Sequence, residues 1–407
     1  MSDRSEAGKQ FDLISNGVDV DAFGRQRVSF NKTLFYGQFR YGIHPLIWKT
    51  LTATGGAVTY NSATNDVTLS CTASTGSRAV IESPYLIYQP GKSNLIKITA
   101  NPNSAGYSLR YVVRKGGVDT PITQDLFNRD KLDGSGFSKF NMDFTKAHIL
   151  SFDFQHLGVG IIRFCVEKET GETILSNVVE NPNNITSMYM NSAQLPLRCE
   201  AVADADFTYK RFGYFNDLDG IFFEFRADVA IGSFTFFCGA VETENGDSRE
   251  DDFALPFSAE TAIGGRAMGV SLLPFICIRP RTTYESKTNR SVIIPTGISI
   301  GSAATTRTLR MKLILNPTLT NPSFSAVDAN SAMEFDIAAT ALSGGTVLRS
   351  WTINLPGNFQ IPKLNLIERI TLGLNVAGTT ADILCLALNA STASANVVGS
   401  LLWKEYQ

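Results

Sequence analysis

The sequence predicts an all-β protein, with an extended N-terminal arm followed by antiparallel β-sandwich domains of jelly-roll-like type. Three observations lead to this fold class. Apolar and polar residues alternate with a period of two along many short segments, these segments end at Gly, Asn, Asp or Pro, and helical periodicity is scarce. No repeat of fixed period is visible, which argues against a propeller or a β-helix.

The first element, residues 1–50, is predicted to be an arm that docks on a neighbouring subunit. Its aromatic side chains alternate with arginines but lack the strand periodicity that would bury them within the chain. Aromatic and arginine side chains are enriched at protein interfaces. The candidate partner-docking residues are Phe23, Arg25, Arg27, Phe30, Phe35, Tyr36, Phe39, Arg40 and Tyr41. Stacking on single-stranded nucleic acid is the alternative for such a mixture, and the overall charge balance argues against it.

Strands separated by turns are predicted through the rest of the chain. In 147–155, Leu150, Phe152 and Phe154 share one face. Residues 161–168 and 173–175 form a predicted hairpin in which Gly171 supplies a positive φ. In 307–315 alternate apolar residues point to a core on one face. Further strands are expected at 79–88, 94–100, 107–114, 221–225, 233–241, 271–279, 291–300, 333–341, 346–353, 366–376 and 382–389.

The strands divide into two predicted sandwiches, at 51–264 and 265–407. A polar, acidic loop at 242–252 separates the Phe-rich strands from the last block. The alanine-rich segment 201–206 is a further candidate boundary. It is left open, because residues 211–241 could return to complete the first sandwich.

Composition limits the function classes. Lys and Arg total 36 against 38 Asp and Glu, so the net charge of −2 provides no general attraction to nucleic acid or an anionic membrane. Charged residues make up only 18% of the chain, which is typical of surfaces hidden in contacts. The six cysteines are widely separated and without CxxC spacing, which favours buried free thiols made in a reducing cytoplasm. The N-terminus does not resemble a signal peptide, and no stretch of about 18 apolar residues occurs.

The sequence predicts no enzyme, no cofactor and no metal site. His44, His148 and His156 have no nucleophile partner in the sequence, and the specific catalytic motifs are absent. The turn at 216–220 begins like a calcium loop but lacks the distal glutamate, so a tight turn is favoured. Asp130 and Asp133 could be a glycosidase pair, although loop turns are commoner.

Tyrosines provide a further alternative, since several of them converging at a loop end could stack on sugar rings. Anchoring of strands or subunit contacts is the favoured role for them. These residues are Tyr85, Tyr88, Tyr107, Tyr111, Tyr189, Tyr209 and Tyr214.

Four blocks of the sequence stand out in one order along the chain. The first is Asp21-Ala-Phe-Gly-Arg-Gln-Arg-Val-Ser29 with the aromatic run at 33–42, similar to a "DAFGRxRVS…TLFD" opening. The others are 144–160, 187–198 and 327–336. Together they resemble a family of tailed-bacteriophage virion structural proteins, and the resemblance extends from about residue 19 to 405. One departure is that the segment 211–224 follows the block at 128–136, whereas the order is reversed in that family.

The resemblance implies a structural subunit on the tail or the outside of the head, made in the host bacterial cytoplasm and located in the virion. Its expected partners are other virion proteins and copies of itself, in a homo-oligomer for which a trimer is suggested by analogy alone. The main alternative is a host-adsorption appendage that binds or cleaves glycans. A secreted adhesin is a third hypothesis, which the missing signal peptide argues against.

Overall fold

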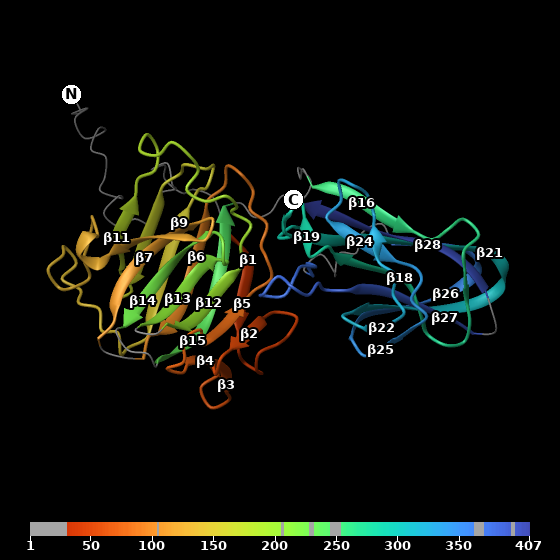
Figure 1. The fold of residues 1–407 in the computed structure, drawn as a ribbon, viewed down its shortest axis with the longest axis horizontal. Coiled ribbons are helices and arrows are strands. Elements are labelled where there is room, and N and C mark those ends of the chain that lie inside the picture. Colours follow the sequence, from red (N-terminus) through yellow and green to blue (C-terminus); the bar gives the residue numbers. More distant parts are fainter. Residues whose placement is uncertain are drawn as a thin grey trace, which may run out of the picture. The chain divides into compact units, whose positions relative to one another are not determined.

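The structure is a computed structural model that describes residues 31–103, 106–204, 207–227, 232–244, 254–361, 370–391 and 395–407. Strands dominate it, and the described residues contain no α-helix. The predicted all-β class is therefore confirmed. The chain divides into two compact units, Met1–Glu250 and Asp251–Gln407, coloured from red to green and from green-cyan to blue in Figure 1.

The first unit is a sandwich of two antiparallel sheets. The larger sheet has the order β11-β10-β9-β6-β15-β4-β3, with β1 also paired to β15. Its strands are β1 (Asn31–Gln38), β3 (Ala57–Asn61), β4 (Asp66–Cys71), β6 (Asn94–Asn101), β9 (His148–Phe154), β10 (Ile162–Glu167), β11 (Thr173–Val179) and β15 (Gly232–Glu244). The last strand of the unit, β15, thus lies between β6 and β4 in the interior of the sheet.

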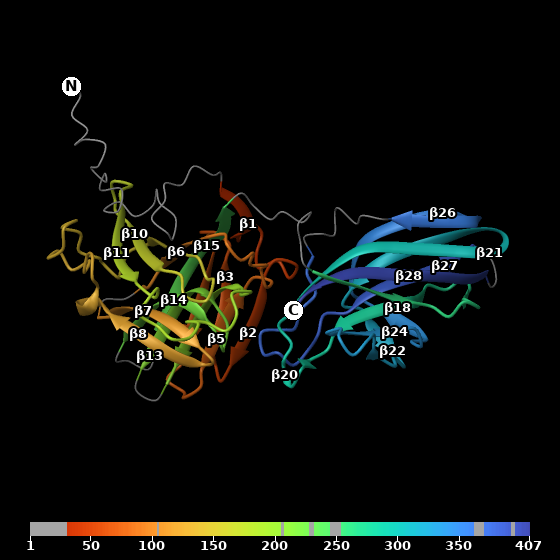
Figure 2. The ribbon, with the colours of Figure 1, turned by 90° about the horizontal axis from the view of Figure 1, so that it is seen from above.

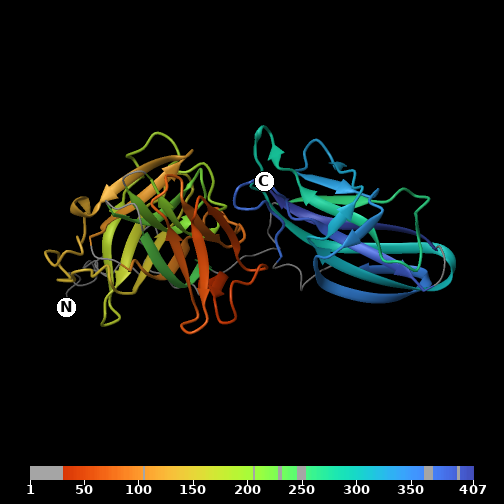
Figure 3. The same ribbon diagram turned by 60° about the horizontal axis from the view of Figure 1, so that its bottom comes forward.

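The second sheet of this unit has the order β2-β5-β12-β13-β14-β7-β8. Its strands are β2 (Lys49–Ala53), β5 (Arg78–Glu82), β7 (Ser108–Lys115), β8 (Val118–Thr123), β12 (Leu197–Ala203), β13 (Thr208–Phe215) and β14 (Gly220–Ala227). Figure 3 shows the strands of both sheets from a second side. Because β12 and β13 pair with each other on either side of residues 204–207, the candidate boundary near 201 is not a domain boundary.

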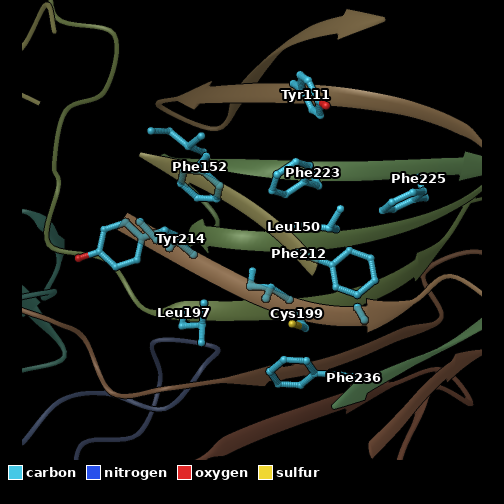
Figure 4. Packing of buried hydrophobic residues seen from close by; sticks show 14 of the residues in the cluster. Tyr111, Leu150, Phe152, Leu197, Cys199, Phe212, Tyr214, Phe223, Phe225 and Phe236 are labelled. Atoms are coloured by element: carbon cyan, nitrogen blue, oxygen red, sulfur yellow. The ribbon is translucent and has the colours of Figure 1, made fainter. Parts of the chain in front are cut away.

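Aromatic side chains from both sheets fill the core between them (Figure 4). The Tyr111 ring of β7 stacks on Phe164 of β10, with ring centroids 4.3 Å apart, and meets Phe223 of β14 edge-on. Phe152 of β9 packs against both of these phenylalanines. Burying rings of this size is a large favourable term, so the two sheets form one cooperative core.

The second unit is built on one curved, nine-stranded sheet of order β16-β28-β21-β27-β18-β24-β23, with β17 paired to β28 and β26 paired to β21. Its strands are β16 (Leu255–Glu260), β17 (Arg266–Met268), β18 (Leu273–Pro280), β21 (Val292–Leu315), β23 (Ser325–Ala326), β24 (Met333–Asp336), β26 (Thr346–Ile361), β27 (Leu384–Ala390) and β28 (Ala395–Tyr406). Two short ribbons, β19 (Thr283–Tyr284) with β20 (Lys287–Thr288) and β22 (Thr318–Thr320) with β25 (Ala341–Ser343), complete the unit.

The long strand β21 organises this unit, as Figure 2 shows. Its first half pairs with β28 and its second half with β27, while β26 follows the opposite edge. The segments 291–300 and 307–315, predicted as separate strands, are therefore parts of one strand. Leu309, Met311 and Leu313 are buried, which confirms the predicted core face.

Two predicted domain limits differ from the structure. The unit boundary lies between Glu250 and Asp251, because β16 pairs with β28, so the predicted division at 264/265 is too late. The described part of the predicted arm, residues 31–50, belongs to the first unit, because β1 pairs with β15 and Phe39 and Trp48 are buried. Residues 1–30 lie outside the described residues.

Local predictions hold in the hairpin of β10 and β11. The two strands pair antiparallel, and Gly171 in the turn between them has a φ of +82°. Parts of the predicted strand 366–376 and of the acidic loop 242–252 lie outside the described residues.

Candidate functional site

The predicted partner-docking residues separate into buried and exposed groups. Phe39 is only 1% exposed and packs on Trp48 and Phe236, with ring centroids 5.3 Å away in each case. Phe35 meets the same indole edge-on. Trp48 also covers Gly37, where an added Cβ would lie 2.1 Å from the indole. Phe39 is therefore a core residue of the folded unit, and Phe35 is half-buried against the same core.

Tyr36, Arg40 and Tyr41 do lie on the surface. Tyr36 is 67% and Tyr41 90% exposed, and the Arg40 guanidinium lies 5.4 Å from the centre of the Tyr41 ring. Phe23, Arg25, Arg27 and Phe30 lie outside the described residues. The surface part of the predicted set is thus reduced to three side chains around the end of β1.

Asp130 and Asp133 each stabilise a loop. The buried Asp130 carboxylate accepts the backbone N–H groups of Leu132 (2.9 Å) and Ser138 (2.7 Å). Asp133 accepts the N–H of Ser135 at 2.8 Å and its hydroxyl at 2.5 Å. Both carboxylates accept local donors, as expected of turn residues rather than of a catalytic pair.

The turn at 216–220 is held by similar bonds. Asn216 Oδ1 accepts the N–H groups of Leu218 (2.7 Å) and Asp219 (2.8 Å). Asp219 Oδ1 in turn accepts the N–H of Asn191 at 2.9 Å. Among the described residues no group of three His, Cys, Asp or Glu side chains could hold a metal ion.

Each of the three histidines makes a contact that supports the local fold. His44 Nδ1 accepts the N–H of Leu46, and His148 Nε2 lies 2.8 Å from the carbonyl oxygen of Asp143. His156 meets the Tyr189 ring edge-on at 5.0 Å. Burial lowers the pKa values of His148 and His156, which keeps both rings neutral at pH 7.

Most of the predicted tyrosine set is buried. Tyr88, Tyr107, Tyr111, Tyr189 and Tyr214 are each at most 8% exposed. Their rings belong to the core, so they anchor strands and do not offer a sugar-stacking platform.

Sequence reasoning missed a network of charged side chains on the outer face of the second sheet, which we call the charged face. Side chains alternate along β12, so Leu197, Cys199 and Ala201 enter the core while Arg198 and Glu200 point to the other face. The network comprises the arginines 78, 110, 114, 198 and 211 and the carboxylates Glu82, Asp119, Glu200, Asp217 and Glu224. Five positive and five negative charges cancel.

Glu200, which is fully buried, is the centre of the charged face. Its Oε2 lies 3.0 Å from Arg78 and 2.8 Å from Arg198. Its Oε1 lies 3.0 Å from Arg211. Asp217 bridges the first two arginines, at 2.6 and 2.9 Å. Both of these carboxylates therefore meet at least two guanidinium groups.

The network continues across β14 and β7 to β8. Arg211 Nε lies 2.7 Å from Glu224, which also pairs with Arg110. Arg114 pairs with Asp119 at 2.5 Å, and Arg211 lies 3.6 Å from the same carboxylate. The chain of pairs thus crosses the sheet from β5 to β8.

These contacts keep Glu200 and Asp217 ionised. Burial by itself raises the pKa of Glu200, but the neighbouring guanidinium groups, Arg198 foremost, hold that pKa well below its usual range. Asp217 is affected in the same way, since Arg198 and Arg78 lower its pKa against the effect of burial. A general acid must carry a proton at its working pH, so neither carboxylate is suited to that role.

A second feature missed from the sequence is the loop-end patch, a set of exposed apolar side chains on three loops and the first residue of β8 in the first unit. Its members are Val118 (69% exposed), Leu157 (50%), Val159 (40%), Met188 (49%) and Leu218 (47%). Hydrogen bonds join the loops, from Tyr189 N–H to Gly158 O at 3.0 Å and from Gly117 N–H to Leu218 O at 2.7 Å. Contiguous exposed apolar surface is characteristic of protein contact sites.

A cavity of about 350 Å³, which we call the polar pocket, opens beside β9 and β10. Phe140 forms part of its wall, and Asp143, Lys146, His148 and Glu167 supply polar groups. A partly apolar wall with a few polar groups is typical of small-ligand sites.

Comparisons with known proteins place this chain in no family. No protein-family model and no curated protein matches it. An endo-1,3-beta-glucanase from Streptomyces sioyaensis aligns with 53% of this chain and 97% of its own at 12% identity and a TM-score of 0.30.

A lectin from Bauhinia forficata in complex with GalNAc aligns with 52% of this chain and 99% of its own, at 9% identity and a TM-score of 0.19. The N-terminal CBM22-1–CBM22-2 tandem domain of Paenibacillus barcinonensis Xyn10C aligns with 92% of this chain and 99% of its own. The identity is 9% and the TM-score is 0.22. TM-scores this low indicate no shared function. Within the described residues no helix has the length and apolar character needed to cross a bilayer.

Proposed function

We propose that this protein is a non-catalytic structural subunit of a tailed-bacteriophage particle, on the tail or the capsid surface, that contacts copies of itself and other virion proteins. The observation that carries the proposal is the loop-end patch, because five exposed apolar side chains on joined loops favour a protein partner. The sequence resemblance to virion structural proteins provides the particle context.

The charged face supports the non-catalytic part of this proposal. Its carboxylates are paired with arginines, and the turn carboxylates Asp130, Asp133 and Asp219 accept backbone N–H groups. A retaining or inverting glycosidase needs one protonated carboxyl group and one free carboxylate facing the substrate. The described carboxylates considered for that role are committed to folding contacts.

The first test is particle association. We expect the protein to co-sediment with purified particles and to appear in their mass spectra, and a particle map should place it on the tail or head exterior. Light scattering of the purified chain should report a discrete oligomer, for which we propose a trimer, or a monomer that assembles only on the particle. Absence of the protein from purified particles would contradict the proposal.

The second test separates the patch from the rest of the surface. Leu157→Asp with Met188→Asp should leave the far-UV spectrum unchanged and reduce oligomerisation or particle incorporation at least tenfold. The matched control is Ile263→Asp, which changes a fully exposed apolar residue of the second unit. Equal incorporation of both variants would rule out the patch as the contact surface.

A second candidate function, glycan binding during host adsorption, is favoured by the polar pocket. An aromatic wall beside carboxylates and lysines could hold a sugar ring and its hydroxyl groups. A glycan array should then show binding that Phe140→Ala or Glu167→Gln abolishes. Glu172→Gln, at an exposed position in the β10–β11 turn, is the control.

Depolymerase activity of the purified chain, lost on replacement of Asp130, Asp133, Asp217 or Asp219, would instead establish an enzyme.

A further inference from the structure

Two of the six cysteines face each other in the second unit. Strands β18 and β27 run antiparallel, and their register places Cys277 directly opposite Cys385. The two Sγ atoms are 2.8 Å apart. Directly opposed residues of an antiparallel pair project from the same face of the sheet, at a Cβ separation that approaches the range of disulfides.

The surroundings hold these sulfur atoms in place. Both side chains are fully buried and pack with Ile314 and Ala387 in one apolar cluster. On the other side of β18, Asp336 of β24 pairs in register with Cys277 and accepts three backbone N–H groups. The cysteine-bearing part of β18 is thus fixed from both neighbouring strands.

The other cysteines provide a contrast. The Cys71 thiol donates to the carbonyl oxygen of Ser77 at 3.4 Å, while Cys165 and Cys199 lie on strands of opposite sheets. Cys238 is partly exposed on β15. None of the six is part of a disulfide in the structure. Geometry therefore selects Cys277 and Cys385 as the pair to oxidise.

We propose that Cys277 and Cys385 form a cross-strand disulfide when the protein leaves a reducing compartment for an aerobic medium. Two S–H bonds break and one S–S bond forms. The two protons and two electrons pass to dissolved dioxygen, which becomes hydrogen peroxide. The bond closes a loop between residues 108 positions apart and joins two interior strands of the nine-stranded sheet.

The effect of the bond follows from the size of this loop. A cross-link restricts the unfolded chain, and longer loops lose more conformational entropy. The second unit should therefore be more stable when oxidised, while the first unit should be unaffected. Because the hydrogen bond with Cys385 and burial both raise the pKa of the Cys277 thiol, and only thiolates react, oxidation should be slow and should require local opening.

The test compares reduced and oxidised full-length protein. After incubation in air-saturated buffer, the chain is denatured without reductant, alkylated with N-ethylmaleimide and weighed. Reduced protein should take up six maleimides, one per cysteine, and oxidised protein four. Peptide mapping should find residues 277 and 385 in one linked peptide, and the thermal midpoint of the second unit should rise.

Variants make the assignment specific. Cys277→Ser and Cys385→Ser should each prevent the loss of alkylation sites, whereas Cys238→Ser should still lose two. The comparison of reduced with oxidised wild type needs no variant, so it decides the matter even if a serine variant fails to fold. Six maleimides on the air-treated wild type, or a cross-link between other cysteines, would overturn the proposal.

Discussion

At the scale of single residues, Glu200 shows how a charge can be buried in this protein. It is fully buried, and three arginines within 3.0 Å satisfy its two oxygens. A buried ion pair of this kind contributes little to folding stability compared with a well-packed apolar pair. Removal of one partner, however, leaves the other charges buried and unpaired. The cost of substitution is therefore much larger than the net value of the contact.

We expect Glu200→Gln to lower the free energy of unfolding of the first unit by about 3–5 kcal/mol. Glu180→Gln is the matched control, because Glu180 is 60% exposed and lies 3.5 Å from an exposed Arg129. That change should cost less than about 1 kcal/mol. Urea unfolding followed by fluorescence measures both, and equal stabilities would show that the charged face contributes nothing.

Lys210 is the opposite case, a buried amine held by a carbonyl oxygen and an aromatic ring. Its Nζ donates to the carbonyl oxygen of Pro102 at 2.5 Å and lies 3.8 Å from the centre of the Tyr107 ring. Burial lowers the pKa of Lys210 to about 7. Between that value and the unfolded pKa of about 10.4, the unfolded chain binds a proton that the folded chain does not.

The stability contributed by Lys210 should therefore increase as the pH rises from about 7 to about 10, with a slope approaching about 1.4 kcal/mol per pH unit. Lys210→Met should remove this slope, whereas Lys139→Met, at an exposed position, should retain it. Unfolding in urea at pH 7, 8 and 9 provides the measurement. Parallel pH profiles for all three proteins would contradict the assignment.

At the scale of elements, local alternation predicted most of the strands, including β7 and β14, whose Arg114 and Glu224 are buried. It located β9, the β10–β11 hairpin and the second half of β21. It missed β12 and β13, because Arg198, Glu200 and Arg211 look like surface residues when only the sequence is considered. Their partners lie on other strands, so their burial depends on long-range pairing.

The candidate site was predicted less well than the fold. Phe39 looked like an interface aromatic, because Trp48 and Phe236, which bury it, come from other elements. The i, i+2 spacing of Arg198 with Glu200 was a local signal of the charged face. The loop-end patch had no such signal, since its members come from four segments that are far apart in the sequence.

Truncation distinguishes an arm from a core strand. Removing residues 1–30 should leave a folded first unit, whereas removing residues 1–40 should destabilise it, because β1 and Phe39 are lost.

Phe39→Ala should lower the free energy of unfolding of the first unit by about 3–5 kcal/mol. Tyr41→Ala, at a 90% exposed position, should change stability by less than about 0.5 kcal/mol. Thermal melts followed by circular dichroism compare the four proteins.

At the scale of the whole molecule, each unit closes its own sheets. The sheets at residues 31–244 contain strands of the first unit alone, and those at 255–406 contain strands of the second alone. Compact units with separate cores are expected to fold independently.

Met1–Glu250 and Asp251–Gln407, expressed as separate chains, should therefore each give a cooperative thermal transition. The two midpoints should reproduce those of the full chain to within a few degrees. A fragment without a cooperative transition would show that its fold depends on the other.

The position of β28 has a consequence for synthesis on the ribosome. This strand, the last in the described chain, lies between β16 and β21 in the interior of its sheet, so the earlier strands of the second unit cannot complete that sheet without it. The first unit can close once β15 has emerged. At roughly 5–20 residues per second, the 157 residues of the second unit (407 minus 250) take about 8–30 s to translate. During that interval nascent chains carry a finished first unit and an open second sheet, which is when they are most exposed to aggregation and most in need of a chaperone.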